Sequence, residues 1–326
     1  MVEKIMITGG AGYIGSHLTY ALANKKKKKI ISIDNLSTSH KSFINKKSIF
    51  YKLNINSKRI KKICAEHKIT SLIHLAASLS VEESEKNPNK YYNNNFLNTM
   101  KLLNNIKDSK IKKIIFASTC SVYGESNLPF KENSKIDPKN NYGFSKYLCE
   151  EFIKNFCKKN NINYAILRYF NVAGSDYKNN IGQINKNGQL IKNICINILK
   201  NKPINVYGKD YNTKDGTCVR DYIHIKDLTD IHIKVLNYLN KKKNVILNCG
   251  YQKPSSVLEV INSFKKNSKN KITIKFSKRR TGDPAIAYAN NSKLRKLINF
   301  KPKFANLDKI VKDSLYFEKK LLENKI

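Results

Sequence analysis

The sequence lacks the features by which several large classes of protein are recognised. None of its 326 residues belongs to a run approaching the ~20 uncharged apolar residues that a membrane-spanning helix needs. The seven cysteines show no Cys-x-x-Cys spacing, and the six histidines form no metal-ligand cluster. The N-terminus, Met1 to Lys4, has no signal-peptide pattern. These absences predict a cytoplasmic protein with reduced thiols, without a metal site and without a membrane partner.

Arginine is also scarce, although the chain is strongly basic. Only six of the 62 basic residues are arginines, and the formal net charge is +38. A large positive charge attracts nucleic acids, but base reading and tight phosphate binding favour the fixed fork of arginine donors. Here lysine accompanies abundant asparagine and isoleucine along the whole chain. We therefore interpret the charge as a compositional bias, which predicts adhesion to polyanions at low salt and no specific nucleic-acid partner.

What the sequence does contain is, first, a glycine-rich turn between a strand and a helix. An apolar strand at 4–8 leads into Gly9-Gly10-Ala11-Gly12-Tyr13-Ile14-Gly15, and a helix follows. Glycines let the backbone turn tightly and approach a pyrophosphate, which the free amides of the helix start can bind. A second strand, 30–33, ends in Asp34, the usual place for a carboxylate that binds the adenosine ribose and repels a 2′-phosphate. The pattern predicts a site for NAD rather than NADP.

Strands and helices keep alternating as far as residue 170. We expect further strands at 48–53, 71–76, 113–119 and 164–170, and helices at 58–67, 88–109 and 142–160. This alternation predicts an α/β fold with a Rossmann-like, doubly wound parallel sheet. Ligands of such sheets bind beyond the carboxyl ends of the strands, where Gly9, Asp34, Ala76, Thr119 and Asn171 fall.

After Phe170 the alternation breaks. Residues 171–190 read as a long loop, and the chain continues with helices near 190–200, from Asp227, near 256–266 and at the C-terminus, and with strands at 204–208, 244–249 and 272–274. We expect an NAD-binding domain at 1–170, to which 222–252 returns. Residues 171–221 and 253–326 then form a smaller C-terminal substrate-binding lobe.

Tyr142 and Lys146 are the candidate catalytic pair. Four residues apart on a helix, they share one face. A phenol titrates near pH ~10, and a neighbouring ammonium favours the phenolate and lowers that pKa. The pair can therefore supply a proton acceptor at neutral pH, which an alcohol needs before it can give up a hydride.

The motifs together resemble the extended short-chain dehydrogenase/reductase family, and within it the UDP-glucose 4-epimerases. The matching segments span nearly the whole chain, and the most specific is Asp215-Gly216-Thr217-x-Val219-Arg220-Asp221-Tyr222-Ile223-His224. The resemblance implies that Tyr142 takes the proton of the sugar 4-hydroxyl while C4 passes a hydride to NAD⁺. Lys146 would hold the phenolate and the nicotinamide ribose, and Thr119 would relay the proton.

The resemblance also assigns binding residues. The implied cofactor contacts are Gly9, Gly12, Tyr13, Ile14, Gly15, Asp34, Asn35, Ser39, Asn54, Ile55, Leu75, Ala76, Ala77, Asn94, Thr119, Tyr142, Lys146 and Tyr169. The implied UDP-sugar contacts are Thr119, Tyr142, Tyr169, Phe170, Asn171, Gln189, Leu190, Asn205, Tyr207, Arg220, Arg280, Asp283 and Ala287. Arg220 and Arg280 would hold the diphosphate, because guanidinium forks suit it.

The chain departs from the family pattern at three positions. Asn54 stands where many members carry Asp, and Leu79 where some carry Lys. Ala287 stands where epimerases restricted to glucose and galactose carry a large Tyr. A small residue there would leave room for an N-acetyl group, so UDP-N-acetylglucosamine is an additional expected substrate.

Two other functions stay open from the sequence. Sugar 4,6-dehydratases share the fold and the Tyr-Lys pair, but they carry Asp-Glu where Cys120 and Ser121 stand, and neither residue can act as their acid or base. A basic NAD- and nucleic-acid-binding module is favoured only by the charge. The family also implies a homodimer that pairs the helices near 89–109 and 143–158 of each subunit.

Overall fold

The computed structural model describes residues 2–124, 127–176, 178, 180–185, 189–241, 244–280 and 283–323. Its contacts divide the chain into two compact units. The first comprises 1–122, 136–168 and 229–247, and the second comprises 123–135, 169–228 and 248–326. Segment 123–135 therefore belongs with the second unit, although it follows a strand of the first.

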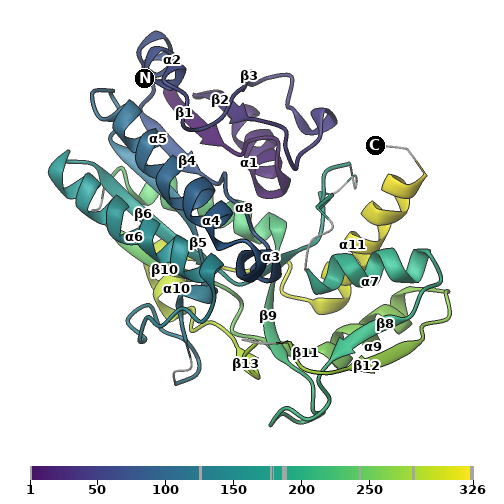
Figure 1. Ribbon diagram of the computed structural model, residues 1–326. Coiled ribbons are helices and arrows are strands. Elements are labelled where there is room, and N and C mark those ends of the chain that lie inside the picture. Colours follow the sequence, from purple (N-terminus) through teal and green to yellow (C-terminus); the bar gives the residue numbers. More distant parts are fainter. Residues whose placement is uncertain are drawn as a thin grey trace. The chain divides into compact units, whose positions relative to one another are not determined.

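The first unit is built on a seven-stranded sheet in the order β10-β6-β5-β4-β1-β2-β3 (Figure 1). Each strand pair within β5-β4-β1-β2-β3 is parallel. The strands are β1 (Glu3–Thr8), β2 (Lys28–Asp34), β3 (Ile49–Lys52), β4 (Ser71–His74), β5 (Lys113–Thr119), β6 (Asn163–Tyr169) and β10 (Val245–Cys249). This order confirms the predicted doubly wound sheet, and it reverses between β1 and β4, where such folds bind ligands.

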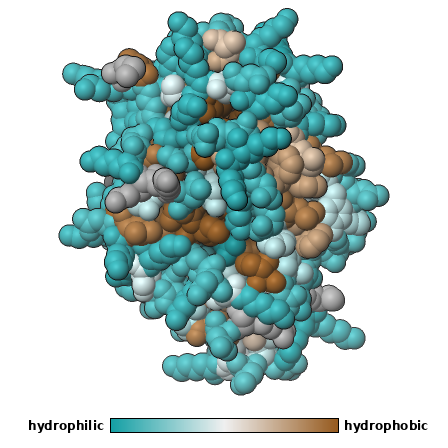
Figure 2. Space-filling model, turned by 90° about the vertical axis from the view of Figure 1, so that its left-hand side faces the viewer, coloured by the Kyte–Doolittle hydropathy of each residue, from teal (hydrophilic) through white to brown (hydrophobic). Residues whose placement is uncertain are grey.

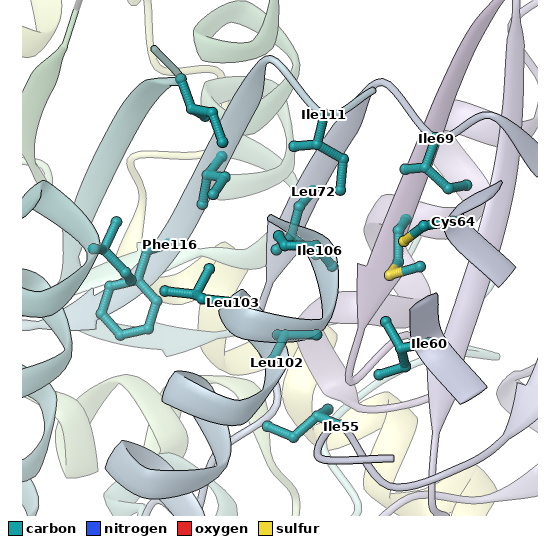
Figure 3. Close-up of a cluster of buried hydrophobic side chains, with 14 of the residues drawn as sticks. Ile55, Ile60, Cys64, Ile69, Leu72, Leu102, Leu103, Ile106, Ile111 and Phe116 are labelled. Atoms are coloured by element: carbon teal, nitrogen blue, oxygen red, sulfur yellow. The ribbon is translucent and has the colours of Figure 1, made fainter. Parts of the chain in front are cut away.

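Helices lie against both faces of this sheet (Figure 1), and longer ones such as α2 and α5 bury apolar residues that recur on one side. The helices of this part of the chain are α1 (Tyr13–Ala23), α2 (Arg59–His67), α3 (Val81–Lys86), α4 (Pro88–Tyr91), α5 (Asn98–Ile106), α6 (Asn141–Lys159) and α8 (Ile225–Tyr238). The cluster of buried side chains in Figure 3 joins α2, α5 and α6 to the strands. It includes Ile60, Leu72, Leu103 and Phe116.

One predicted helix differs from its expected form. The helix expected at 88–109 is interrupted by a π-type segment, Tyr92–Leu97, which lies between α4 and α5. Such a segment widens one turn and shifts the register of the side chains that follow. Within this segment Asn95 is buried and only 1 % exposed.

The second unit contains two small sheets and four helices within the residues described. One sheet has the order β11-β9-β13, with β7 also paired to β9, and the other joins β12 to β8. The strands are β7 (Asn171–Ala173), β8 (Ile204–Tyr207), β9 (Val219–His224), β11 (Pro254–Ser256), β12 (Ile274–Ser277) and β13 (Ile286–Ala287). The helices are α7 (Leu190–Leu199), α9 (Val257–Asn267), α10 (Ser292–Ile298) and α11 (Leu307–Leu322).

The expectation of an uninterrupted loop at 171–190 was wrong at its start. Residues 171–173 form β7, which is parallel to the last residues of β9. No local pattern predicts so short a strand, because its hydrogen bonds come from a distant segment. Lys186, Asn187 and Gly188 of the expected loop, and Thr281 and Gly282 of the Arg-Arg-Thr-Gly-Asp segment, lie outside the described residues.

Candidate active site

The glycine turn after β1 has the geometry of a dinucleotide site. Gly9 has φ +71°, and a Cβ there would lie 2.9 Å from the amide nitrogen of Ala76. A Cβ on Gly15 would lie 2.0 Å from the carbonyl oxygen of Gly9, so only glycine fits at either position. Gly12 is the N-cap of α1 and, as a glycine, has no side chain that could cap the amides of the first turn. A helix start without a side-chain cap fits a pyrophosphate, which binds readily to the backbone amides there.

The Asp34 carboxylate stabilises the neighbouring edge of this turn. Its Oδ2 accepts a hydrogen bond from the Ala11 amide at 3.1 Å, and its Oδ1 accepts one from Ser39 Oγ at 2.9 Å. Asn35 Nδ2 donates to Asn54 Oδ1 at 2.7 Å. Two pairs of predicted cofactor contacts are therefore hydrogen-bonded, Asp34 with Ser39 and Asn35 with Asn54. The predicted contact Ile55, which follows Asn54, is buried.

A buried asparagine lies next to the predicted Asn94. Asn94 Nδ2 donates to Ser78 Oγ at 3.0 Å, in the loop after β4 that contains Leu75, Ala76 and Ala77. Asn95 makes more bonds: its Oδ1 accepts from the Ser78 amide at 2.8 Å, and its Nδ2 donates to Ser145 Oγ at 3.1 Å. It thereby links α6 to this loop. Sequence reasoning missed Asn95 because a regular helix was expected, and the run of three asparagines was the available signal.

Tyr142 and Thr119 meet at the carboxyl end of β5. The Thr119 side chain lies near the phenol of Tyr142. Thr119 Oγ1 accepts the Ser121 amide at 3.1 Å, which fixes its orientation. Burial raises the pKa of Tyr142 to about 12, and the Thr119 hydroxyl opposes that rise.

Lys146 lies one turn further along α6 and is 3 % exposed. Its Nζ lies 4.3 Å from the centroid of the Phe116 ring. Burial lowers the pKa of Lys146 to about 8, while Cys149 and Glu150 oppose the change. The expected lowering of the Tyr142 pKa by Lys146 is not observed. Burial dominates instead, and Lys146 is not among the groups that shift the pKa of Tyr142.

In the second unit, two of the predicted diphosphate and nucleoside contacts bind each other. Arg220 Nη2 and Asp283 Oδ1 are 2.6 Å apart. The guanidinium of Arg280 lies 4.0 Å from the centroid of the Tyr207 ring, and Tyr207 is 36 % exposed. Ala287 of β13 pairs with Arg220 of β9 and is buried.

The remaining predicted residues of this unit lie on three segments. Tyr169 and Phe170 are buried, and Asn171 Nδ2 donates to the carbonyl oxygen of Asp221 at 3.3 Å. Gln189 is the N-cap of α7, and Leu190 opens that helix. Asn205 lies on β8 beside Lys275 of β12.

The described residues hold no group of three or more His, Cys, Asp or Glu side chains that could bind a metal ion. In the same part of the chain, no helix combines the length and the apolar character needed to span a membrane. Six of the seven cysteines are buried, and Cys120, which follows Thr119, is half-buried.

Comparisons with known proteins agree with this geometry. Over 307 residues, 93 % of each chain, the sequence is 36 % identical to the UDP-glucose 4-epimerase of Rhizobium meliloti (strain 1021). A solved UDP-glucose 4-epimerase from Bifidobacterium longum, in complex with NAD⁺ and UDP, superposes with a TM-score of 0.91 at 33 % identity, covering 97 % of this chain and 98 % of that one. The UDP-Glc/GlcNAc 4-epimerase of Campylobacter jejuni superposes with a TM-score of 0.85 at 36 % identity, covering 98 % and 99 %.

This chain also matches the model of one protein family. The model for the NAD dependent epimerase/dehydratase family matches residues 5–250, which include the glycine turn, Asp34, Thr119, Tyr142 and Lys146. With relatives above 30 % identity across almost the whole chain, this match shows that the chain belongs to the NAD dependent epimerase/dehydratase family.

Proposed function

We propose that this protein is an NAD-dependent epimerase that inverts C4 of a UDP-hexose through a transient 4-keto sugar. The observation that supports the proposal most strongly is the position of Thr119, at the end of β5, near the buried Tyr142 of α6, within the unit that contains the dinucleotide turn. A carbinol carbon can release a hydride only when a base takes its hydroxyl proton, and the phenolate of Tyr142, once a neighbouring positive charge favours it, suits that role.

The first unit contains residues for the cofactor and for the proton transfer. The amides of the glycine turn would bind the pyrophosphate, Asp34 the adenosine ribose, and Lys146 the nicotinamide ribose. When bound, NAD⁺ supplies a hydride acceptor that returns the same hydride to the sugar. Tyr142 Oη takes the proton from the 4-hydroxyl and gives it back after the ketone has turned its other face, and Thr119 orients both hydroxyls.

Residues of the second unit would hold the nucleotide. Arg220 and Arg280 would donate to the diphosphate, once Arg220 exchanges its partner Asp283. Asp283 is then free to accept from the uridine ribose. The stacked pair of Arg280 and Tyr207 offers a flat surface for the nucleotide.

The sugar range follows from a small side chain. Ala287 is next to Arg220 in the paired strands β13 and β9, where a tyrosine would occupy much more space. We therefore propose UDP-glucose and UDP-galactose as substrates, together with UDP-N-acetylglucosamine and UDP-N-acetylgalactosamine.

A dehydratase reaction is disfavoured by the residues after Thr119. Cys120 and Ser121 supply no carboxyl group, and Ser121 already bonds Thr119 through both its amide and its hydroxyl.

The test of the proposed epimerase function is the conversion of each of the four UDP-sugars by the purified protein. We expect both pairs to interconvert, and a protein that converts none of them has another function.

We also propose a homodimer that pairs the helical segments near 89–109 and 143–158 with the same segments of a second copy. Leu97 and Phe144 are each 40 % exposed, and Phe144 packs edge-on against Tyr92. Figure 2 views the side on which α5 and α6 lie in Figure 1, and hydrophobic patches interrupt its hydrophilic surface. Light scattering should give the mass of a dimer for the wild type and of a monomer for Phe144→Glu, whereas a monomeric wild type would exclude the pairing.

A further inference from the structure

A buried ion pair lies behind the candidate catalytic residues. Glu150 of α6 is fully buried, and Arg168 of β6 is 2 % exposed. Arg168 Nη2 donates to Glu150 Oε2 at 2.6 Å, and Arg168 Nε donates to Oε1 at 3.0 Å. Ser118 Oγ of β5 donates to the same Oε1 at 2.5 Å. One carboxylate therefore joins the helix to two neighbouring strands of the sheet.

This carboxylate lies on the active face of α6. Tyr142, Lys146 and Glu150 follow one another at intervals of four residues, which places them on a single side of the helix. Ser118 directly precedes Thr119, so its bond to Glu150 also fixes the strand end that contains the hydroxyl partner of Tyr142. A shift of α6 along the sheet would break all three bonds to Glu150.

Glu150 also affects the charge of Lys146. Its ammonium faces the Phe116 ring of β5, His74 of β4 and Cys149 of α6. His74 is neutral near pH 7, because burial and the charge of Lys146 lower its pKa to about 3. Glu150 is a carboxylate that raises the pKa of Lys146, so its negative charge favours the protonated lysine.

Stability alone does not explain such a pair. A buried ion pair adds little net stability compared with apolar residues of the same size, since removing both charges from water costs several kcal/mol. Breaking one partner, in contrast, leaves an uncompensated buried charge. The described part of the chain contains a comparable pair elsewhere, Lys192 and Glu318, which are 5 % and 3 % exposed and have no link to Tyr142 or Lys146.

We propose that Glu150, held by Arg168 and Ser118, is a positioning residue that fixes α6 on the sheet and supplies the counter-charge for the Lys146 ammonium. The role rests on the proposed function, in which a charged Lys146 binds the nicotinamide ribose and favours the phenolate. Glu150 itself would contact neither cofactor nor substrate. It would set the charge state of Lys146, which contacts the cofactor in the proposed function.

The test measures the titration of Lys146 directly and the epimerase reaction separately. Lysine ¹⁵N resonances of the NAD-loaded protein are followed against pH, and the Lys146 signal is the one lost in Lys146→Met. The variants are Glu150→Gln and the double variant Glu150→Met/Arg168→Met, which removes both buried charges and guards against failure to fold. Glu318→Gln is the matched control, because it breaks the other buried pair.

We expect the pKa of Lys146 to fall by about one pH unit or more in Glu150→Gln, which removes the carboxylate and leaves the Arg168 cation in place. In the double variant, which removes both charges, the fall should be smaller, and turnover should still drop because α6 has lost its anchor. Glu318→Gln should leave the pKa of Lys146 unchanged. In each variant the alkaline limit of turnover should move with the pKa of Lys146, while the double variant keeps wild-type thermal stability. An unchanged titration of Lys146 in Glu150→Gln, or wild-type turnover by the double variant, would overturn the proposal. If the pKa of Lys146 shifts as expected but the wild type converts no UDP-sugar, the role of Glu150 stands and the epimerase function is wrong.

Discussion

Arg220 and Asp283 form an ion pair, with 2.6 Å between Nη2 and Oδ1, although the family resemblance implies that both residues contact the UDP-sugar. Arg220 Nη1 also donates to the carbonyl oxygen of Val219 at 2.8 Å. The guanidinium is thus held in its position by the backbone, and only its outer nitrogen is occupied by a carboxylate. A diphosphate that binds Arg220 must replace that carboxylate.

Replacing Asp283 by asparagine should therefore strengthen the binding of inorganic pyrophosphate. The gain should be several-fold, since a partly exposed ion pair is worth up to ~1 kcal/mol. UDP should gain less, because an amide side chain cannot bind the ribose hydroxyls as a carboxylate does. Calorimetric titration measures both affinities. Asp210→Asn is the control, because Asp210 pairs with the neighbouring Arg279. Weaker pyrophosphate binding in Asp283→Asn would contradict the competition.

Tyr142 should be a neutral phenol until the cofactor is present. Burial raises its pKa to about 12, so the NAD-free protein should show no phenolate absorbance from Tyr142 at pH 9. Bound NAD⁺ adds a positive charge, which favours the phenolate and should lower this pKa. The measurement is the difference in phenolate absorbance between the wild type and Tyr142→Phe against pH, with and without NAD⁺. A titration near neutral pH without NAD⁺ would show that the protein alone ionises Tyr142.

Ala287→Tyr should narrow the range of sugars. Ala287 is buried next to Arg220, and a tyrosine there would fill the space proposed for the N-acetyl group. We expect turnover of UDP-N-acetylglucosamine to fall by at least ~10-fold, equivalent to ~1.4 kcal/mol, with UDP-glucose little affected. Steady-state assays with both sugars give the ratio. Equal losses for the two sugars would indicate a general disturbance of β13 and not a specificity position.

Stability should fall below pH ~6.5, the ordinary pKa of histidine in an unfolded chain. The buried His74 bonds Thr8 and Thr99 and has its pKa lowered to about 3, so in this range the unfolded chain binds a proton that the folded chain does not. This contribution is complete above pH ~6.5 and is lost as the pH falls, at up to ~1.4 kcal/mol per pH unit. Urea unfolding at several pH values should give a shallower decline for His74→Gln than for the wild type. If the free energy of unfolding falls equally with pH in the wild type and in His74→Gln, then His74 does not cause the decline.

Local pattern was sufficient for most of the first unit. The strand expected at 113–119 has those bounds, and the helix with Tyr142 begins at Asn141. The strand is predictable because it is a short, continuous and largely apolar run, and the helix because it is long and has Tyr142, Lys146, Glu150 and Ile153 at helical spacing. The π-type segment at 92–97 was not, because it depends on bonds that Asn95 makes to residues distant in sequence.

Pairings between distant residues were also beyond the sequence. The motifs identified Arg220 and Asp283 as ligand contacts, but nothing local indicates that they neutralise each other in the free chain. The same applies to Lys146, whose pKa is lowered by burial and raised by its neighbours Cys149 and Glu150. Residue type and spacing predict candidates for chemistry, whereas their charge state depends on the packing around them.

The most direct test of the central claim compares the wild type with Tyr142→Phe in the interconversion of UDP-galactose and UDP-glucose, with bound NAD measured in both proteins. The account predicts an active wild type and a variant that retains NAD but loses at least ~10²-fold in turnover, the contribution of a general base. Near-normal turnover in Tyr142→Phe, or no interconversion by a wild type that contains NAD, would contradict it.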